Sequence, residues 1–247
     1  YVDGVLQSTV TSNTFLQNWI PNTEIVCRAT PNDGKEDGSH SEVSAVVDNT
    51  PPEVDSVILN PPMLTTNDTL TATAVMSDPD VTHAVTGRYE WHVIDFVTGL
   101  DSEVQSGANN TLSGVTHFDR DDEVYVIVTP NDGIEDGLPV TSSSITVSNS
   151  NPSAPTVSIT PNPAVVTDDL LCAVDVPSTD VDGDSIVYTY VWTDASGMNP
   201  QTTVSVAALS DTLLSQNISE GNWTCEVTPF DGSISGMSVS ATTEVTN

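Results

Sequence analysis

One five-residue motif, Thr-Pro-x-Asp-Gly, occurs three times in the 247-residue chain at a constant spacing. The copies are Thr30–Gly34, Thr129–Gly133 and Thr228–Gly232, so each begins 99 residues after the one before. A second glycine stands four residues after each motif glycine, at Gly38, Gly137 and Gly236. A fixed period of this length indicates tandem copies of one small domain, each long enough to have its own core.

Other segments recur in register with the motif and predict where each unit begins and ends. A unit ends in asparagine after a short alternating run, and a proline-rich stretch opens the next unit. The predicted domains are the C-terminal half of a unit in residues 1–49 and complete units in residues 50–149 and 150–247. We therefore expect either a slice of a longer array or a subunit whose incomplete domain is completed by a neighbour.

The residue pattern within a unit predicts an all-β fold of antiparallel β-sandwiches. Residues 69–74 and 88–93 alternate between polar and apolar, whereas residues 123–128 are almost wholly apolar, as expected of a central strand. Turn residues recur about every 8–12 residues, which is typical of a sandwich. The Thr-Pro-x-Asp-Gly motif is interpreted as the turn between the last two strands, and the second glycine as closing that turn or opening a bulge.

The charge of the chain restricts its partners. Against 35 acidic residues stand only Arg28, Lys35, Arg88 and Arg120, which gives a net charge of -31. Nucleic acid and anionic membrane surfaces are excluded, because both require a basic face. No apolar run approaches the roughly 18 residues that a membrane-spanning helix needs. The charge favours solubility, cation binding or a saline medium.

The positions of the cysteines predict one disulfide. Cys172 and Cys225 occur in one complete unit, and the other complete unit has Ala72 and Val126 at the same two repeat positions. Joint loss of both cysteines suggests that they pair, although two buried thiols would also fit. A structural disulfide implies an oxidising, extracytoplasmic setting. Cys27 has no partner in this chain, and we expect its partner in the missing first half of its unit.

The order Cys172, Trp192, Cys225, on segments that read as strands B, C and F, resembles the immunoglobulin-like sandwich. More closely, the units look like the Ig-like, PKD- or cadherin-like tandem repeats of large bacterial and archaeal surface proteins. The residues that carry this resemblance are Asp180–Asp184, Tyr190–Trp192, Cys225–Gly232 and the Asn-x-x-Pro between units. The resemblance covers essentially the whole chain, and it implies stalks, adhesins, sheaths or filaments outside the cell.

An acidic loop in the last unit is the strongest candidate for a bound ion. Asp180, Asp182 and Asp184 alternate around Gly183, and carboxylates spaced in this way in a bent loop can converge on one Ca²⁺. The preceding unit has a thinner version in Asp78 and Asp80. The alternative is an ordinary acidic turn without an ion. Calcium is the only cofactor that the sequence suggests.

The aspartates of the repeated motif, Asp33, Asp132 and Asp231, are interpreted as turn formers, with a metal at the junction between units as the alternative. Trp91 and Trp192 are expected in the cores, whereas Trp19 or Trp223 could be exposed and contact a glycan or a neighbouring subunit. The histidines show no metal-binding spacing; they are His40, His83, His92 and His117.

The sequence offers no catalytic signature. It contains no nucleophile elbow, phosphate loop or metalloprotease motif, so the chain is not expected to be an enzyme. Four sequons could carry glycans in a secreted protein, at Asn67, Asn109, Asn217 and Asn222.

These observations predict a non-catalytic structural protein at the cell surface or outside the cell. Sandwiches joined by proline-rich linkers make an extended rod or filament. The half unit in residues 1–49 would need strands from the same longer chain or, by strand addition, from another subunit. A calcium-dependent adhesin that binds glycan or protein is the alternative, and an accessory region of a secreted enzyme is a third possibility.

Overall fold

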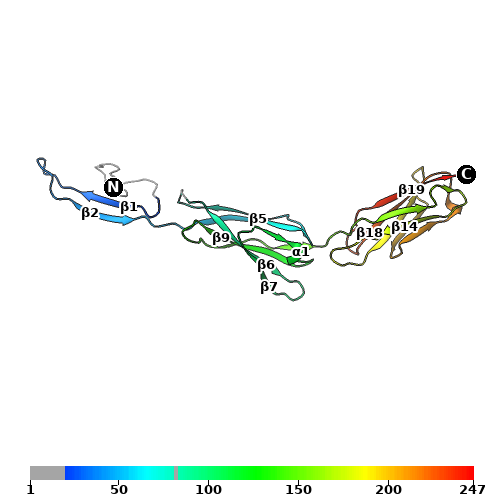
Figure 1. Cartoon of the computed structure of the whole chain (residues 1–247), viewed down its shortest axis with the longest axis horizontal. Coiled ribbons are helices and arrows are strands. Elements are labelled where there is room, and N and C mark those ends of the chain that lie inside the picture. Colours follow the sequence, from blue (N-terminus) through cyan, green and yellow to red (C-terminus); the bar gives the residue numbers. More distant parts are fainter. Residues whose placement is uncertain (1–19, 81–82) are drawn as a thin grey trace.

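The computed structural model describes residues 20–80 and 83–247, and the fold in these ranges is almost entirely β-strand. The described helical structure consists of one short turn, α1 (Gly114–His117), and a 3-10 turn at Ser215–Asn217. Figure 1 shows a hairpin and two β-sandwiches that follow one another along the long axis. The predicted all-β class with tandem sandwiches is confirmed.

The first described element is a two-stranded antiparallel hairpin. Strand β1 (Glu24–Ala29) pairs with β2 (Ser41–Val46), and the first copy of the repeated motif lies in the turn between them. Every residue of β2 is exposed, including Val43 at 69% and Val46 at 59%. In the described part of the chain, this hairpin therefore lacks the second sheet that the other two units have.

The middle sandwich consists of a three-stranded sheet facing a larger one. The first sheet has the order β3 (Glu53–Asn60), β5 (Thr69–Ser77) and β8 (Thr111–Ser113). The second has the order β4 (Leu64–Thr65), β11 (Ile145–Ser148), β9 (Glu123–Asn131), β6 (Thr86–Ile94) and β7 (Asp101–Gly107), and β10 (Val140–Thr141) also pairs with β9. Strands β4 and β11 are parallel, and the other pairs are antiparallel.

The C-terminal sandwich repeats this topology. Its smaller sheet has the order β12 (Thr156–Thr160), β14 (Leu170–Val176) and β17 (Ser210–Leu213). Its larger sheet has the order β13 (Ala164–Val165), β19 (Val239–Thr246), β18 (Gly221–Phe230), β15 (Val187–Thr193) and β16 (Gln201–Val206), with β13 parallel to β19. In both sandwiches the opening strand changes sheets at an Asn-Pro step, where proline cannot donate to a ladder.

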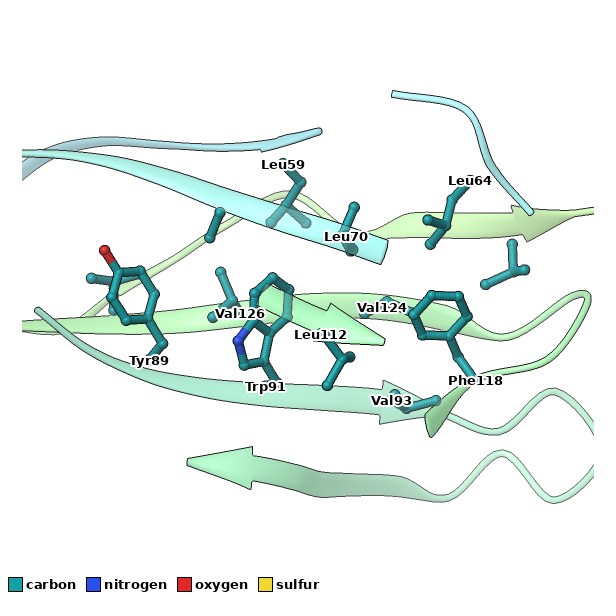
Figure 2. Packing of buried hydrophobic residues seen from close by; sticks show 13 residues of the cluster. Leu59, Leu64, Leu70, Tyr89, Trp91, Val93, Leu112, Phe118, Val124 and Val126 are labelled. Atoms are coloured by element: carbon teal, nitrogen blue, oxygen red, sulfur yellow. The ribbon is translucent and has the colours of Figure 1, made fainter. Parts of the chain in front are cut away.

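A tryptophan lies at the centre of each sandwich. Tyr89, Trp91 and Val93 alternate along β6, so all three point to the same face of the sheet. Figure 2 shows Trp91 between the sheets, with Leu70, Leu112 and Val126 among its surroundings. Trp192 has the same place in the C-terminal core, and neither indole is accessible to solvent. The predicted core positions of Trp91 and Trp192 are confirmed.

The predicted disulfide between Cys172 and Cys225 is present. It joins β14 in one sheet to β18 in the other, with 6.4 Å between the two Cα atoms. Ala72 and Val126 occupy the corresponding positions in the middle sandwich, and both are completely buried. The two units therefore fill one inter-sheet position in two ways, with a covalent bond or with a small aliphatic pair.

All three copies of the repeated motif form the predicted turn. Gly34, Gly133 and Gly232 have φ angles of 89°, 90° and 101°, which a residue with a side chain rarely adopts. In each turn, Oδ1 of the motif aspartate accepts two backbone N–H groups; for Asp132 these belong to Ile134 and Glu135, both at 2.8 Å. The second glycine closes the turn by donating to the carbonyl of the motif proline.

Replacing both cysteines by the residues that the middle unit has at these positions tests how much the disulfide contributes to stability. The double variant Cys172→Ala/Cys225→Val is expected to fold and to lose about 2–4 kcal/mol in its free energy of unfolding, because the unfolded chain is no longer cross-linked. Urea unfolding followed by Trp fluorescence measures the change, and reduced wild-type protein is the control. A variant as stable as the oxidised wild type would contradict the expectation.

Tyr190 gives the C-terminal sandwich a dependence on alkaline pH. Burial, with the nearby charges of Tyr188 and Asp211, raises the pKa of Tyr190 to about 12, and its hydroxyl donates to the Ala208 carbonyl at 2.7 Å. Because the folded pKa exceeds the ordinary value of 10.0, this contribution to stability is complete below pH 10 and is lost as the pH rises toward 12.

Alkaline unfolding of wild type and Tyr190→Phe measures this effect. The stability of the variant is expected to fall less steeply between pH 10 and pH 12 than that of the wild type. Tyr125→Phe is the control, because Tyr125 also has a pKa of about 12 but lies in the middle sandwich, so it should leave the alkaline unfolding of the C-terminal sandwich unchanged. Equal slopes in wild type and Tyr190→Phe would show that the hydroxyl does not titrate in this way.

Candidate functional site at the junctions between units

The asparagine that ends each unit binds the motif aspartate of the following unit. Asn49 Nδ2 donates to Asp132 Oδ2 at 2.8 Å and to Glu135 Oε1 at 2.9 Å. Asn149 Nδ2 donates to Asp231 Oδ2, also at 2.8 Å. One oxygen of each aspartate therefore organises its turn, while the other holds the linker that enters the domain.

The residue after each asparagine makes a second repeated contact. The Thr50 N–H donates to Asp80 Oδ2 at 2.8 Å, and the Ser150 N–H donates to Asp182 Oδ2 at 2.6 Å. The Ser150 hydroxyl also lies 3.3 Å from Asp182 Oδ1. Two of the predicted metal ligands, Asp80 and Asp182, thus lie at the junctions and accept hydrogen bonds from the linker.

The second glycine of each complete unit lies against the linker backbone. A Cβ added to Gly137 would lie 1.8 Å from the Pro52 carbonyl oxygen, and one added to Gly236 would lie 2.4 Å from that of Pro152. Both separations are far below any real Cβ contact, so only glycine permits this approach. In the hairpin, the nearest atom to a Cβ on Gly38 would be Cγ of Pro31 in its own turn, at 3.0 Å.

At the second junction the structure brings Asp180, Asp182 and Asp184 together, with a ligand atom from each lying within 4.8 Å of the others. Asp180 Oδ1 accepts the Asp182 N–H at 2.8 Å, whereas Asp180 Oδ2 is buried and has no hydrogen-bond partner. A cation bound here would give this unpaired oxygen the partner that it lacks. The arrangement is compatible with one ion held by these three carboxylates.

Arg120 of the middle sandwich brings a positive charge into the same junction. Its guanidinium group bonds to Asp184 Oδ2 and donates to Asn149 Oδ1 at 2.7 Å. The hydrogen bond with Asp184 is the main cause that raises the pKa of Arg120, and Asp182 and Asp121 add to it. The side chain therefore ties the middle sandwich, the linker and the acidic loop of the next domain together.

The first junction has a different set of groups. The structure places Asp78 beside His83 and Asp132. Sequence spacing does not single out His83, but folding brings it next to Asp78 of its own loop and Asp132 of the motif turn. The backbone N–H of Glu135 is the main cause that lowers the pKa of Asp132 to about 2, and the Asn49 amide adds to it.

The remaining predicted residues lie as follows. All four sequon asparagines are exposed: Asn67, Asn109, Asn217 and Asn222. Cys27 is an exposed free thiol on β1. Trp223 is buried, with 2% of its surface exposed, and so offers no surface to a glycan, whereas Trp19 lies outside the described residues. No described helix has the length and apolar character needed to cross a membrane.

Sequence comparison assigns no family, because no family model matches and no curated protein matches significantly. The chain is similar to solved structures. A segment of two fibronectin type-III domains from chicken tenascin is 12% identical over 77% of this chain and 98% of its own, with a TM-score of 0.43. The chicken interferon gamma receptor alpha chain is 9% identical over 78% and 98%, with a TM-score of 0.49. The FN1–FN3 domains of chicken CNTN1 are 17% identical over 91% and 79%, with a TM-score of 0.33.

Proposed function

We propose that the chain is a non-catalytic structural protein whose Ig-like domains form a stiff extracellular rod. The observation that carries this proposal is the repeated joint. At both junctions an asparagine amide binds the motif aspartate of the next domain, and the following backbone N–H binds an aspartate of its acidic loop. Because both joints are built from equivalent residues, they support the same orientation between one domain and the next.

The physical case for stiffness rests on the number of restraints on each short linker. Neighbouring domains generally move relative to one another unless their interface is fixed. Here each linker makes hydrogen bonds to carboxylates, and such bonds to charged groups contribute about 1.5–3 kcal/mol each. Prolines restrict the linker backbone, and Gly137 or Gly236 contacts it directly. Together these restraints oppose bending at the joint.

Two properties support a location outside the cell. The Cys172–Cys225 disulfide is typical of proteins that mature in an oxidising compartment. The net charge of -31 keeps rods apart by mutual repulsion and favours solubility. On the resemblance to Ig-like, PKD- and cadherin-like repeats, we place the chain among large bacterial or archaeal surface proteins as part of the proposal.

The exposed hairpin supports assembly as part of this function. Strands β1 and β2 flank the first copy of the motif, as the last strands of the complete units flank theirs, and Val43 and Val46 are exposed. We propose that strands from the same longer chain or from another subunit complete this unit, and completion by another subunit would produce a filament. The alternative, a calcium-dependent adhesin, is favoured by the buried, unpaired oxygen of Asp180.

Small-angle X-ray scattering on Gly137→Ala tests the rod. The added methyl group cannot fit beside the Pro52 carbonyl, so the linker is expected to leave the turn and the domains to bend more freely. The scattering should then require a broad range of shapes, whereas the wild type fits one extended shape. Gly38→Ala is the matched control, because it alters the same turn position without this linker contact. A wild type that already samples strongly bent shapes would refute the rod.

Thermal unfolding with calcium or with a chelator tests the ion site. If Asp180, Asp182 and Asp184 hold Ca²⁺, saturating calcium stabilises the wild type, by about 2.7 kcal/mol at one hundred times the dissociation constant. Asp180→Asn should lose most of this gain. Asp175→Asn is the control, because Asp175 is an exposed residue of β14 in the same domain and accepts a hydrogen bond from the Ser158 hydroxyl, outside the acidic loop. A wild type that does not respond to calcium would exclude the site and the calcium-dependent adhesin.

A further inference from the structure

The first junction contains buried polar atoms without partners. The Asp78 side chain is 3% exposed and that of Asp132 is fully buried, while 18% of the His83 side chain is exposed. Neither Asp78 Oδ2 nor His83 Nδ1 has a hydrogen-bond partner. Leaving such a group unpaired in the interior costs about 1–3 kcal/mol, and more when it is charged. The arrangement therefore calls for a further group between these atoms.

The distances in this cluster fit ligands that share one small ion. His83 Nδ1 lies 3.9 Å from Asp78 Oδ2 and 3.7 Å from Asp132 Oδ2. Both separations are too long for a hydrogen bond, which extends to about 3.2 Å. Zinc binds histidine nitrogen and carboxylate oxygen at about 2.0–2.2 Å, so two of its ligands lie at most about 4.4 Å apart. Both measured separations are within that limit.

The donor types distinguish this cluster from the acidic loop at the second junction. One imidazole nitrogen with two carboxylate oxygens suits zinc and related transition metals, whereas calcium prefers six to eight oxygen atoms. Asn49 also holds Asp132 Oδ2 through its amide nitrogen, which orients that carboxylate as an outer partner of a metal ligand would. We propose that Asp78, His83 and Asp132 bind a divalent transition metal of the zinc class.

Comparison of the two junctions shows why the first one requires a cation from solution. At the second junction the guanidinium group of Arg120 supplies a positive charge to Asp184. One repeat earlier, the position of Arg120 is occupied by Pro21, which has no charge. The bound metal would take the place of this charge. Through Asp78, His83 and Asp132 it would connect two loops of the middle sandwich, next to the linker held by Asn49.

Metal titration of the full chain tests the site. The protein is stripped with a chelator and titrated calorimetrically with Zn²⁺, and Co²⁺ is used as a spectroscopic probe of the ligands. Every variant carries Cys27→Ser, so that the exposed thiol does not bind metal. The result expected is one ion per chain, with affinity reduced at least about tenfold in His83→Gln and in Asp78→Asn, since even outer partners of a metal change affinity by about 10–100-fold.

His92→Gln is the matched control. The His92 side chain is 19% exposed, similar to that of His83, but it lies on β6 outside the cluster, where it stacks on Tyr125 and contacts Asp101. The affinity of the His92→Gln variant for Zn²⁺ should equal that of the wild type. Circular dichroism of each metal-free variant shows whether it is folded. If it is, a loss of metal affinity is due to the missing side chain and not to unfolding.

Three outcomes would overturn the proposal. The first is no binding of Zn²⁺ or Co²⁺ by the wild type. The second is binding that survives in His83→Gln, which would place the metal elsewhere. The third is calcium binding at this cluster that does not depend on His83. This proposal does not depend on the proposed rod. The titration measures metal affinity, whereas the scattering measures the shape of the chain, so one can fail without the other.

Discussion

The carboxylate of the motif aspartate is the interaction on which the arrangement of this chain depends. In Asp132 and Asp231, Oδ1 accepts the N–H groups of its own turn, and Oδ2 accepts the amide of the preceding linker. The same side chain thus fixes the loop and the angle at which the chain enters the domain. A neutral residue here would weaken both, because the bonds to a charged acceptor are the strong ones.

The interior of the two sandwiches shows that one topology tolerates different ways of joining its sheets. The Cys172–Cys225 bond in one unit corresponds to Ala72 and Val126 in the other, and both pairs are buried beside a tryptophan. The core of the middle sandwich therefore folds around Trp91 by packing alone. The covalent bond in the other unit adds stability to an interior that is already specified by its apolar pattern.

Much of this structure follows from the sequence, because strands, turns and the disulfide are encoded by local patterns or by comparison of the repeats. The positive φ of Gly133 and the buried position of Trp192 can each be predicted from a few neighbouring residues in the sequence. The junctions could be predicted only in part. The sequence suggests pairing Asp78 with Asp80, two residues away, because that loop resembles the acidic loop of the last unit. Folding instead groups Asp78 with His83 and Asp132, and no local pattern records such proximity. The fixed register of Asn49 and Asn149 against the motif was the signal that could have revealed the linker contact.

The parallel strand pairs at the edge of each larger sheet have a mechanical consequence. In the C-terminal sandwich, β13 near the entry of the chain runs parallel to β19 near its exit, and β4 and β11 do so in the middle sandwich. Tension between the two ends of the chain would pull such a pair in opposite directions along its length, so that its backbone hydrogen bonds are loaded together rather than one at a time. Once a domain yields, the segment between Cys172 and Cys225 cannot extend, whereas the middle domain has no such limit. If this chain were stretched, its middle unit would lengthen most.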